Sequence, residues 1–365
     1  MSEGRAIGLN EKALIAMSGG VDSSVAAYLM KEKGYDCIGV TMKLFTNDDA
    51  GVPREHSCCS LSDVEDARSV AYSLNMPYYV FNFADRFRET VMDPFVEAYE
   101  NGRTPNPCID CNRWLKFEKL FLRARELSCS FLVTGHYARV EKDEKSGRYL
   151  LKKGRDVSKD QSYVLYSLNQ EQLAFLKLPL GDLEKAEVRR IADEQNFINS
   201  YKPDSQDICF VQSGKYSRFI ETYTGKTYPE GDFVDLQGNV IGRHKGIIRY
   251  TVGQRKGLGI ASSHPLYVVR VLPETNQVVL GSNEDLFSRT LTARDVNLIS
   301  VERIDTPMRV KAKVRYRHTE QWATALQTGP DEIRVEFDEP QRAITPGQAV
   351  VLYSGDTVVG GGTIQ

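Results

Sequence analysis

The chain of 365 residues has no long hydrophobic run and only two tryptophans. No stretch approaches the ~18 consecutive apolar residues that a membrane-spanning helix needs. The opening residues, MSEGRAIGLNEK, also lack the apolar segment of a secretory signal. We therefore expect a cytoplasmic protein with no membrane partner.

Cysteine is sparse: the chain has seven, which is an odd number. A secreted disulfide framework is therefore excluded, whereas thiol chemistry and metal binding remain open. Cys37 lies in an apolar run, and we interpret it and Cys129 as buried packing residues. Cys58 and Cys59 lie next to each other in a polar segment, which leaves a surface position, a metal site or a redox pair as alternatives.

Neither sign of charge is in excess: 47 Lys+Arg against 49 Asp+Glu give a net charge of −2. This balance argues against a surface that binds a polyanion everywhere. Residues 243–256 and 309–317, however, each hold five cations and no acid. If 309–317 is a strand, its alternation places all five cations on one face, which favours RNA binding over an ordinary solvated face.

A third basic stretch, 113–125, has five cations near helical spacing. The alternative interpretation is an amphipathic helix with Leu115, Leu120 and Leu122 in the core.

The order of apolar runs predicts an α/β fold. Strand-like runs at 13–17, 37–45, 78–83 and 130–140 are separated by helical patterns at 22–34, 62–75 and 115–128, which indicates a parallel sheet covered on both faces. After about residue 210 the pattern changes to short alternating runs between turn pairs, which predicts a small β-barrel or sandwich. We expect domains at 1–210, 211–282 and 283–365.

Between the first strand and the first helix lies the string Ser18-Gly19-Gly20-Val21-Asp22-Ser23-Ser24. Glycines allow close approach of the backbone to phosphate, and the N–H groups and dipole of the helix N-terminus favour an anion. Asp22 could hold Mg²⁺. The string lacks the lysine of a Walker motif and resembles the PP-loop of the ATP pyrophosphatase superfamily, which implies ATP as the cofactor.

Cys108 and Cys111 form a CxxC in the segment RTPNPCIDCNRWLKF, and Cys209 follows much later in KPDSQDICF. Such spacing favours redox or metal chemistry. A closed four-cysteine zinc site would need a further cysteine, whereas three thiolates could hold a [4Fe-4S] cluster with one open iron.

Eight motifs in order give the chain a close resemblance to the tRNA-specific 2-thiouridylases over nearly its whole length. They are SGGVDSS, RTPNPCIDCNRWLKF, TGHYAR, KDQSYVLY, LPLGDLEKAEVR, KPDSQDICFV, YTVGQRKGLGI and RVKAKVRYR. The resemblance implies a PP-loop catalytic domain of the adenine nucleotide alpha hydrolase-like type, a small central tRNA-contacting domain and a C-terminal β-barrel. It also implies thiolation of the wobble uridine of tRNA at C2.

The resemblance further implies site residues. Cys111 matches the nucleophile, and Cys209 matches the cysteine that carries a persulfide and forms a transient disulfide with Cys111. The positions that match ATP contacts are Ala16, Met17, Ser18, Gly19, Gly20, Val21, Asp22, Ser23, Met42 and Gly135. The positions that match the target base or tRNA are Asn106, Pro107, Cys108, His136, Lys159, Asp160, Gln161, Arg315, Tyr316 and Gln348.

Four of these positions have alternatives. His136 could be a satisfied structural histidine, and Asp160 and Gln161 could equally be a helix cap. Some family members carry Asp where this chain has Cys108, which disfavours a general acid/base role at this position here and favours the three-thiol cluster.

The chemistry requires an activated uracil, because the C2 oxygen is a poor leaving group until ATP adenylates it. A persulfide then supplies sulfur to C2. The expected partners are the anticodon region of tRNA and a persulfide donor such as a cysteine desulfurase or a sulfur relay protein. Two other functions remain open: a PP-loop synthetase acting on a small metabolite, and a non-catalytic RNA-binding thiol switch.

Overall fold

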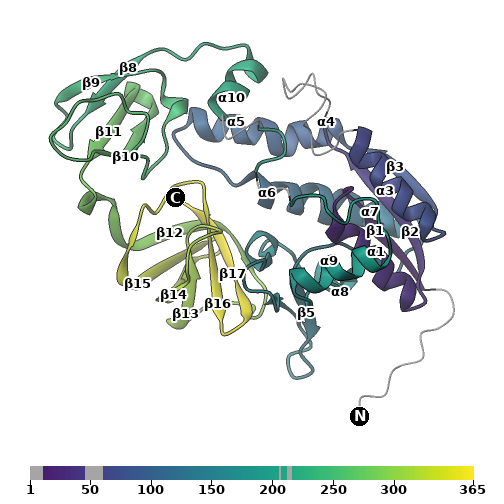
Figure 1. Cartoon of the computed structure of the whole chain (residues 1–365). Helices are drawn as coiled ribbons and strands as arrows, with labels where there is room; N and C mark the ends of the chain where they lie inside the picture. Colours follow the sequence, from purple (N-terminus) through teal and green to yellow (C-terminus); the bar gives the residue numbers. More distant parts are fainter. Residues whose placement is uncertain (1–10, 46–60, 205–206, 212–215) are drawn as a thin grey trace. The chain divides into compact units, whose positions relative to one another are not determined.

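The computed structural model describes residues 11–45, 61–204, 207–211 and 216–365 (Figure 1). Cys58 and Cys59 lie outside these residues. The chain divides into two compact units, residues 1–88 with 109–210, and residues 89–108 with 211–365. Within the described part of the chain, no helix combines the length and the apolar character that crossing a membrane requires.

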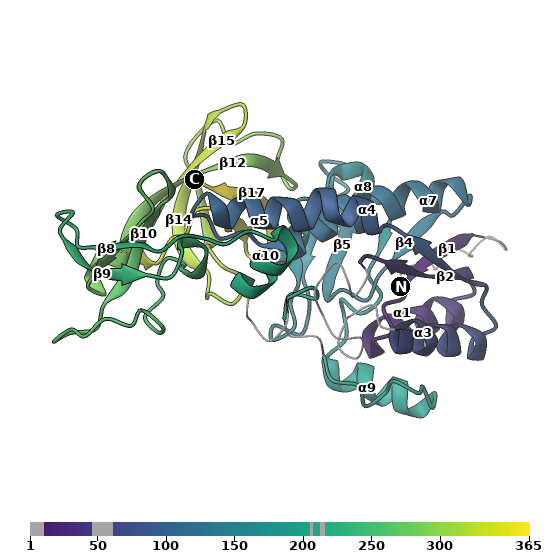
Figure 2. The same cartoon turned by 90° about the horizontal axis from the view of Figure 1, so that it is seen from above.

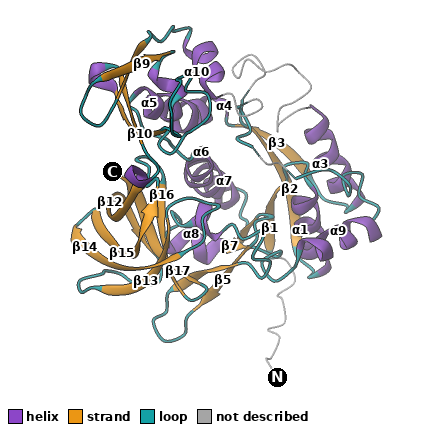
Figure 3. Cartoon of the chain, turned by 60° about the vertical axis from the view of Figure 1, so that its left-hand side comes forward, coloured by secondary structure: helices purple, strands orange, loops and turns teal. Residues whose placement is uncertain are grey.

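The first unit is built on a five-stranded parallel sheet, which confirms the expected α/β fold (Figure 3). Its strand order is β3-β2-β1-β4-β7. The strands are β1 (Lys12–Ala16), β2 (Asp36–Lys43), β3 (Tyr78–Asn82), β4 (Phe131–Val133) and β7 (Leu176–Lys177). The expected single strand at 130–140 is therefore two, because the chain leaves the sheet after Val133 and next forms a hairpin of β5 (Ala138–Lys142) and β6 (Tyr149–Lys153).

Helices follow the strands in the order that a parallel sheet requires. They are α1 (Val21–Glu32), α3 (Leu61–Ser73), α4 (Ala84–Phe87), η2 (Cys111–Lys119), α7 (Leu120–Glu126), η3 (Ser162–Leu165), α8 (Gln170–Phe175) and α9 (Lys185–Glu194). One core cluster joins apolar residues of β1 and α1 with Ala67 and Val70 of α3 and Val188 of α9.

The helical stretch after the CxxC differs from the prediction in its phase. Leu115 and Leu120 are buried as expected, but Leu122 is 45% exposed, so its expected core position is wrong. Residues 111–119 form a π-helix, whose wider turn adds a residue to the repeat and rotates the following side chains relative to a regular α-helix. Phe121 and Ala124 are buried instead.

The second unit contains a sheet of order β10-β11-β8-β9 and a closed barrel (Figure 2). The sheet strands are β8 (Gly231–Val234), β9 (Val240–His244), β10 (Tyr267–Leu272) and β11 (Gln277–Gly281). The barrel strands are β12 (Phe287–Leu298), β13 (Met308–Lys313), β14 (Gln321–Gly329), β15 (Glu332–Arg342), β16 (Ala349–Ser354) and β17 (Thr357–Ile364). Pairing of β12 with β17 closes the six strands, so the barrel alternative is confirmed.

Residues 89–108 group with the second unit. In this unit, aromatic side chains of α5 (Asp93–Glu100) pack against those of α10 (Tyr216–Thr224). The rings of Tyr99 and Tyr216 stack with centroids 4.5 Å apart, and Phe95 meets Phe219 edge-on at 5.9 Å. The domain boundaries near residues 210 and 282 stay predictions.

Candidate active site

The phosphate loop occupies the turn from β1 to α1. Gly19 has φ +78°, and a Cβ there would lie 2.4 Å from the carbonyl oxygen of Asp63. Only glycine fits this combination of conformation and space. Gly20 is the N-cap of α1 and offers no side chain to its first turn. The backbone N–H groups at this helix end are therefore not capped by a side chain, as a phosphate site requires.

The serines of the loop brace it from within. Ser23 Oγ accepts a hydrogen bond from the backbone N–H of Ser18 at 3.2 Å and donates one to the Gly20 carbonyl at 2.9 Å. Ser24 Oγ donates to the same carbonyl at 3.2 Å. These bonds fix the shape of the loop.

The other predicted ATP positions meet at the carboxyl ends of three adjacent strands. Ala16 ends β1, Met42 lies in β2, and Gly135 follows β4. Met17 is held by its N–H to the Val40 carbonyl at 2.8 Å. Ligands of open α/β sheets bind at this edge, so the fold brings these residues to one end of the sheet.

Three side chains that were not assigned from the sequence, those of Lys185, Asp204 and Tyr137, lie around Asp22 of the loop. Lys185 Nζ lies 2.7 Å from Asp22 Oδ1 and 2.7 Å from Asp204 Oδ1. The hydroxyl of Tyr137 donates to Asp22 Oδ1 at 2.7 Å. Burial, followed by the charge of Asp22, raises the pKa of Tyr137 far above its ordinary value, so this hydroxyl keeps its proton.

A second group ties the loop to residues 199–202. Asn199 Nδ2 donates to the Gly19 carbonyl and to Ser24 Oγ, both at 2.9 Å. Lys202 Nζ lies 2.5 Å from Asp63 Oδ1 and also donates to the Gly19 carbonyl at 3.4 Å. Burial alone would lower the pKa of Lys202, but its hydrogen bonds to carboxylates raise it.

Tyr137, Lys185, Lys202 and Asp204 lie inside the motifs TGHYAR, LPLGDLEKAEVR and KPDSQDICFV, whereas Asn199 and Asp63 lie outside them. Only the motifs could have pointed to the first four, because nothing in the local pattern says that any of these residues converge on residues 18–24.

The side chains around the loop suit Mg²⁺ only when phosphate oxygens complete its coordination. Within the described segments, no three His, Cys, Asp or Glu side chains are grouped to hold a metal ion. Mg²⁺ commonly binds one or two carboxylates plus substrate phosphates, and Asp22 offers one such carboxylate beside the helix N-terminus.

The same result bears on the cysteines. Cys108 is exposed, and Cys111 and Cys209 are half-buried. The described residues do not gather these three thiols into a metal-binding group, so the structure gives the predicted [4Fe-4S] cluster no support. Cys37 and Cys129 are buried, as expected, and burial raises the pKa of the Cys37 thiol to about 11.

His136 is buried after β4, with its Nδ1 2.7 Å from Thr134 Oγ1. Burial, followed by the charge of Lys116, places the pKa of His136 well below its ordinary value. The imidazole is therefore neutral at physiological pH.

The KDQ segment carries internal bonds that favour the structural alternative for Asp160. Its Oδ1 accepts from the backbone N–H of Gly154 and of Ser162, each at 3.1 Å. Gln161 Oε1 accepts from the N–H of Tyr137 at 3.0 Å. Lys159 pairs with Asp204 at 2.9 Å. Their tRNA contacts stay predictions.

In the second unit, Gln348 holds the segment that leads to Asn106 and Pro107. Its Nε2 donates to the carbonyls of Thr104 at 2.8 Å and Pro105 at 3.1 Å. Asn106 Oδ1 in turn accepts from the N–H of Cys108 at 3.2 Å.

The prediction that residues 309–317 form one strand with five cations on one face is wrong. Strand β13 ends at Lys313, and a turn follows, so Arg315 and Arg317 do not continue its face. Arg315 Nη2 instead donates to the carbonyls of Val252 at 3.1 Å and Ala343 at 3.3 Å. Alternation of charge and apolar residues extends through a turn as readily as through a strand. Tyr316 in this turn is 37% exposed.

Acidic side chains of other strands also form ion pairs with cations of the two basic stretches. Asp338 of β15 pairs with Arg309, with Oδ1 2.6 Å from Nη1. In the stretch 243–256, Arg243 pairs with Asp232 at 3.0 Å. Neither stretch contains an acid in its sequence, but in the folded protein acids lie next to its cations.

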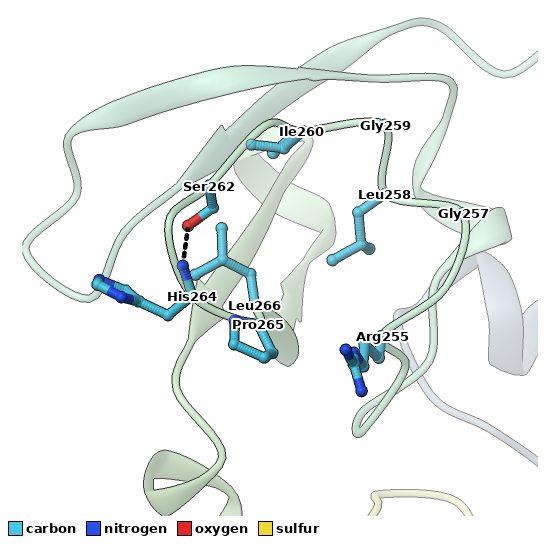
Figure 4. A pocket seen from close by; sticks show the side chains of 9 residues that line it. All are labelled: Arg255, Gly257, Leu258, Gly259, Ile260, Ser262, His264, Pro265 and Leu266. Carbon is cyan, nitrogen blue, oxygen red and sulfur yellow. Dashed lines mark hydrogen bonds between the residues drawn. The ribbon is translucent and has the colours of Figure 1, made fainter.

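The glycine-flanked end of 243–256 borders a cavity of about 210 Å³ (Figure 4). Leu258, Ile260 and Leu266 line it, Arg255 lies at its edge, and the imidazole of His264 points away.

Three family models match the chain in sequence: a tRNA methyl transferase HUP domain over residues 11–213, a tRNA methyl transferase PRC-barrel domain over 217–282 and an aminomethyltransferase β-barrel domain over 288–364. The tRNA-specific 2-thiouridylase MnmA of Clostridioides difficile (strain 630) is 54% identical over 98% of this chain and 99% of its own length. The protein of the same name from Lachnoclostridium phytofermentans is 53% identical over 97% and 99%.

A solved 4-thiouridine synthetase–RNA complex with bound ATP aligns with a TM-score of 0.36 at 17% identity, over 59% of this chain and 50% of that one. This likeness is too low to carry an argument.

Proposed function

The chain belongs to the tRNA-specific 2-thiouridylase family, and from this premise we propose that it is an ATP-dependent enzyme that replaces an oxygen of a tRNA uridine with sulfur. The observation that carries the proposal is the phosphate loop. Its helix N-terminus has no side-chain cap, and its glycine conformation and its end of the sheet suit ATP.

The first step is activation of the uracil. The C2 oxygen attacks the α-phosphorus of ATP, the bond between the α-phosphorus and the bridging oxygen breaks, and pyrophosphate leaves. The N–H groups of the loop stabilise the charge that develops on the phosphates. Mg²⁺ on Asp22 would neutralise part of this charge.

The second step is sulfur transfer. The terminal sulfur of a Cys209 persulfide attacks C2, and AMP leaves with the former C2 oxygen. The thiolate of Cys111 then attacks the remaining S–S bond, which releases the thiocarbonyl and leaves a Cys111–Cys209 disulfide. A dithiol reductant supplies the two electrons that return both thiols, and a persulfide donor recharges Cys209.

The tRNA substrate is proposed to contact both units. The proposed contact residues are Asn106, Pro107, Cys108, His136, Lys159, Asp160, Gln161, Arg315, Tyr316 and Gln348. Among them, Tyr316 and Cys108 have the exposure that direct contact needs. The buried His136 and Asp160 would act by shaping the neighbouring backbone. The wobble uridine is the expected target, since an unstacked anticodon base can enter a pocket.

The test combines ATP, Mg²⁺, a persulfide donor and unmodified tRNA, followed by nucleoside analysis for 2-thiouridine. Cys111→Ser and Cys209→Ser should each abolish thiolation and keep ATP binding. Cys129→Ala serves as the matched control, because Cys129 is buried and its pKa is raised by burial. An unchanged nucleoside profile with the intact protein, under conditions where a characterised relative is active, would refute the proposal.

A further inference from the structure

The helical segment that begins at Cys111 is wound more widely than an α-helix. Residues Cys111–Lys119 form the π-helix η2, and the N–H of Leu120 bonds the carbonyl of Leu115, five residues back. The regular helix α7 follows from Leu120. Because π-helical turns are rare and occur frequently at functional sites, a π-helix that starts at the predicted nucleophile needs a physical cause.

A side chain of α8 bonds into this helix. Gln172 Nε2 donates to the Phe117 carbonyl at 2.5 Å. A side chain that bonds a helix carbonyl competes with the i→i−4 ladder of backbone bonds, which is a known cause of local distortion in helices. Phe117 is 1% exposed, so this bond is shielded from water. The Gln172 amide therefore stabilises the wide turn of η2 over a regular α-helix.

The same side chain caps its own helix. Gln172 Oε1 accepts from the N–H of Asn169 at 3.0 Å, and Asn169 Oδ1 accepts from the N–H of Gln172 at 2.9 Å. This reciprocal pair is the capping box of α8. The acceptor atom of the Gln172 amide thus stabilises α8, and its donor atom stabilises η2. Because the two effects belong to different atoms, substitutions can separate them.

A second bond holds the beginning of η2. Asn112, the residue directly after Cys111, is 3% exposed, and its Nδ2 donates to the Val164 carbonyl of η3 at 3.1 Å. The π-helix is therefore tied at two points to the segment 162–175: at Asn112 by η3 and at Phe117 by α8.

The wide turn decides which way Cys111 faces. Rewinding η2 as an α-helix removes an extra residue from its turns, and each α-helical residue accounts for about 100° of rotation about the axis. Helix α7 is fixed in place, since Phe121 is buried and its ring meets that of Phe175 edge-on at 5.0 Å. The rotation would therefore fall on Cys111.

The present phase of η2 also packs it against His136, one of the predicted tRNA-contacting positions. The ring of Phe117 lies 6.0 Å from the imidazole of His136. Burial, followed by the charge of Lys116, lowers the pKa of His136. One helix thus carries the predicted nucleophile and the residues that adjoin His136, so a change of its phase would move them together.

We propose that Gln172 is a positioning residue for sulfur transfer: its amide donor keeps η2 in the π-helical form that directs the Cys111 thiol to the Cys209 persulfide. Asn112 supports the same geometry at the beginning of the helix. The inference rests on the proposed function, because it takes Cys111 as the thiol that attacks the remaining S–S bond.

A merely structural Gln172 would act through the capping box alone. Gln172→Glu keeps the acceptor for the Asn169 N–H and loses the donor to Phe117, whereas Gln172→Lys keeps a donor and loses the acceptor. Asn169→Ala is the matched control, because it breaks the capping box and leaves the bond from Gln172 to Phe117. Gln172→Met, which has neither donor nor charge, replaces Gln172→Glu if that variant does not fold.

The experiment is a single turnover of the full-length protein, charged beforehand by a persulfide donor, with ATP, Mg²⁺ and unmodified tRNA. Gln172→Glu should slow the formation of 2-thiouridine by about 10- to 100-fold, the effect expected when a reacting group is displaced by about 1 Å. The tRNA concentration that gives half the maximal rate, and the ATP affinity from calorimetry, should stay those of the wild type.

The two remaining variants should separate capping from positioning. Gln172→Lys and Asn169→Ala should react at close to the wild-type rate, while loss of the cap lowers their melting temperatures. A readout without tRNA is closure of the Cys111–Cys209 disulfide by diamide, which takes up the two electrons and two protons of the thiols. Gln172→Glu should slow this closure as well, and Asn169→Ala should not.

A wild-type rate in the folded variant that lacks the donor would overturn the inference alone. Equal slowing in Gln172→Glu and Gln172→Lys would also overturn it, because the rate would then not follow the donor. Absence of 2-thiouridine with the wild type would instead overturn the proposed function and this inference with it.

Discussion

Gly135→Ala adds a single methyl group against the backbone of the phosphate loop. A Cβ at Gly135 would lie 2.8 Å from the carbonyl carbon of Asp22, 2.9 Å from the backbone nitrogen of Ser23 and 3.0 Å from the carbonyl oxygen of Asp22. Ordinary Cβ contacts begin at 3.4 Å, and here the opposing atoms are backbone rather than flexible side chain. The first turn of α1 must therefore move.

The required displacement is roughly 0.5 Å, and overpacking of this kind costs about 1–3 kcal/mol of stability. The moving atoms include the N–H groups that face phosphate. We therefore expect ATP affinity to fall by about tenfold or more, since each 1.4 kcal/mol of lost binding free energy is a factor of ten. Calorimetric titration of ATP and chemical denaturation measure the two effects separately.

The matched control is Gly34→Ala. Gly34 has φ +84° and no heavy atom within 4 Å of its would-be Cβ, so alanine there is strained but meets nothing. It should lower stability by about 1–2 kcal/mol and leave ATP affinity unchanged. The reasoning is refuted if Gly135→Ala binds ATP as tightly as the wild type, or if both variants lose affinity equally.

Three further predictions concern His136, Asn199 and Arg315. Because the folded pKa of His136 lies below its unfolded value, its contribution to stability is complete above pH ~6.5 and is lost as pH falls from there towards the folded pKa. His136→Gln should flatten the fall in melting temperature between pH 7.5 and 5.5; an unchanged slope would show that the pKa of His136 does not differ between the folded and unfolded states. Asn199→Ala should cost about 1–3 kcal/mol in denaturant unfolding and weaken ATP binding, because the Gly19 carbonyl and Ser24 Oγ both lose the Asn199 amide as a donor; unaltered affinity would mean that these bonds do not shape the loop. Arg315→Met should lower the melting temperature as well as tRNA affinity, because its guanidinium joins backbone carbonyls and Thr345; a purely RNA-contacting arginine would leave stability intact.

The loop and the sheet could be predicted from the sequence because their signals are local. An apolar run, a glycine pair and a helical pattern follow one another within residues 13–34, and each has one physical interpretation. The pattern of apolar residues by itself predicted the barrel only as one of two β architectures, since closure depends on the pairing of β12 with β17, which are far apart in the chain.

The charged residues around the loop could not be predicted in the same way. Lys185 and Asp22 are 163 residues apart, and their ion pair exists only because α9 packs on the core cluster shared with α1. The prediction of a cationic strand at 309–317 was wrong for the complementary reason. A one-dimensional pattern showed no acid near Arg309, while the fold places Asp338 of another strand against it.

The bond between Asn199 and Gly19 has a consequence for synthesis of the protein on the ribosome. The loop emerges among the first residues, yet the amide that donates to its Gly19 carbonyl is encoded 180 positions later. At about 5–20 residues per second, the nascent chain carries an unfinished nucleotide site for roughly 10–40 s. A messenger or protein truncated before residue 199 would therefore yield a chain with the complete SGGVDSS string but without the bond that supports it.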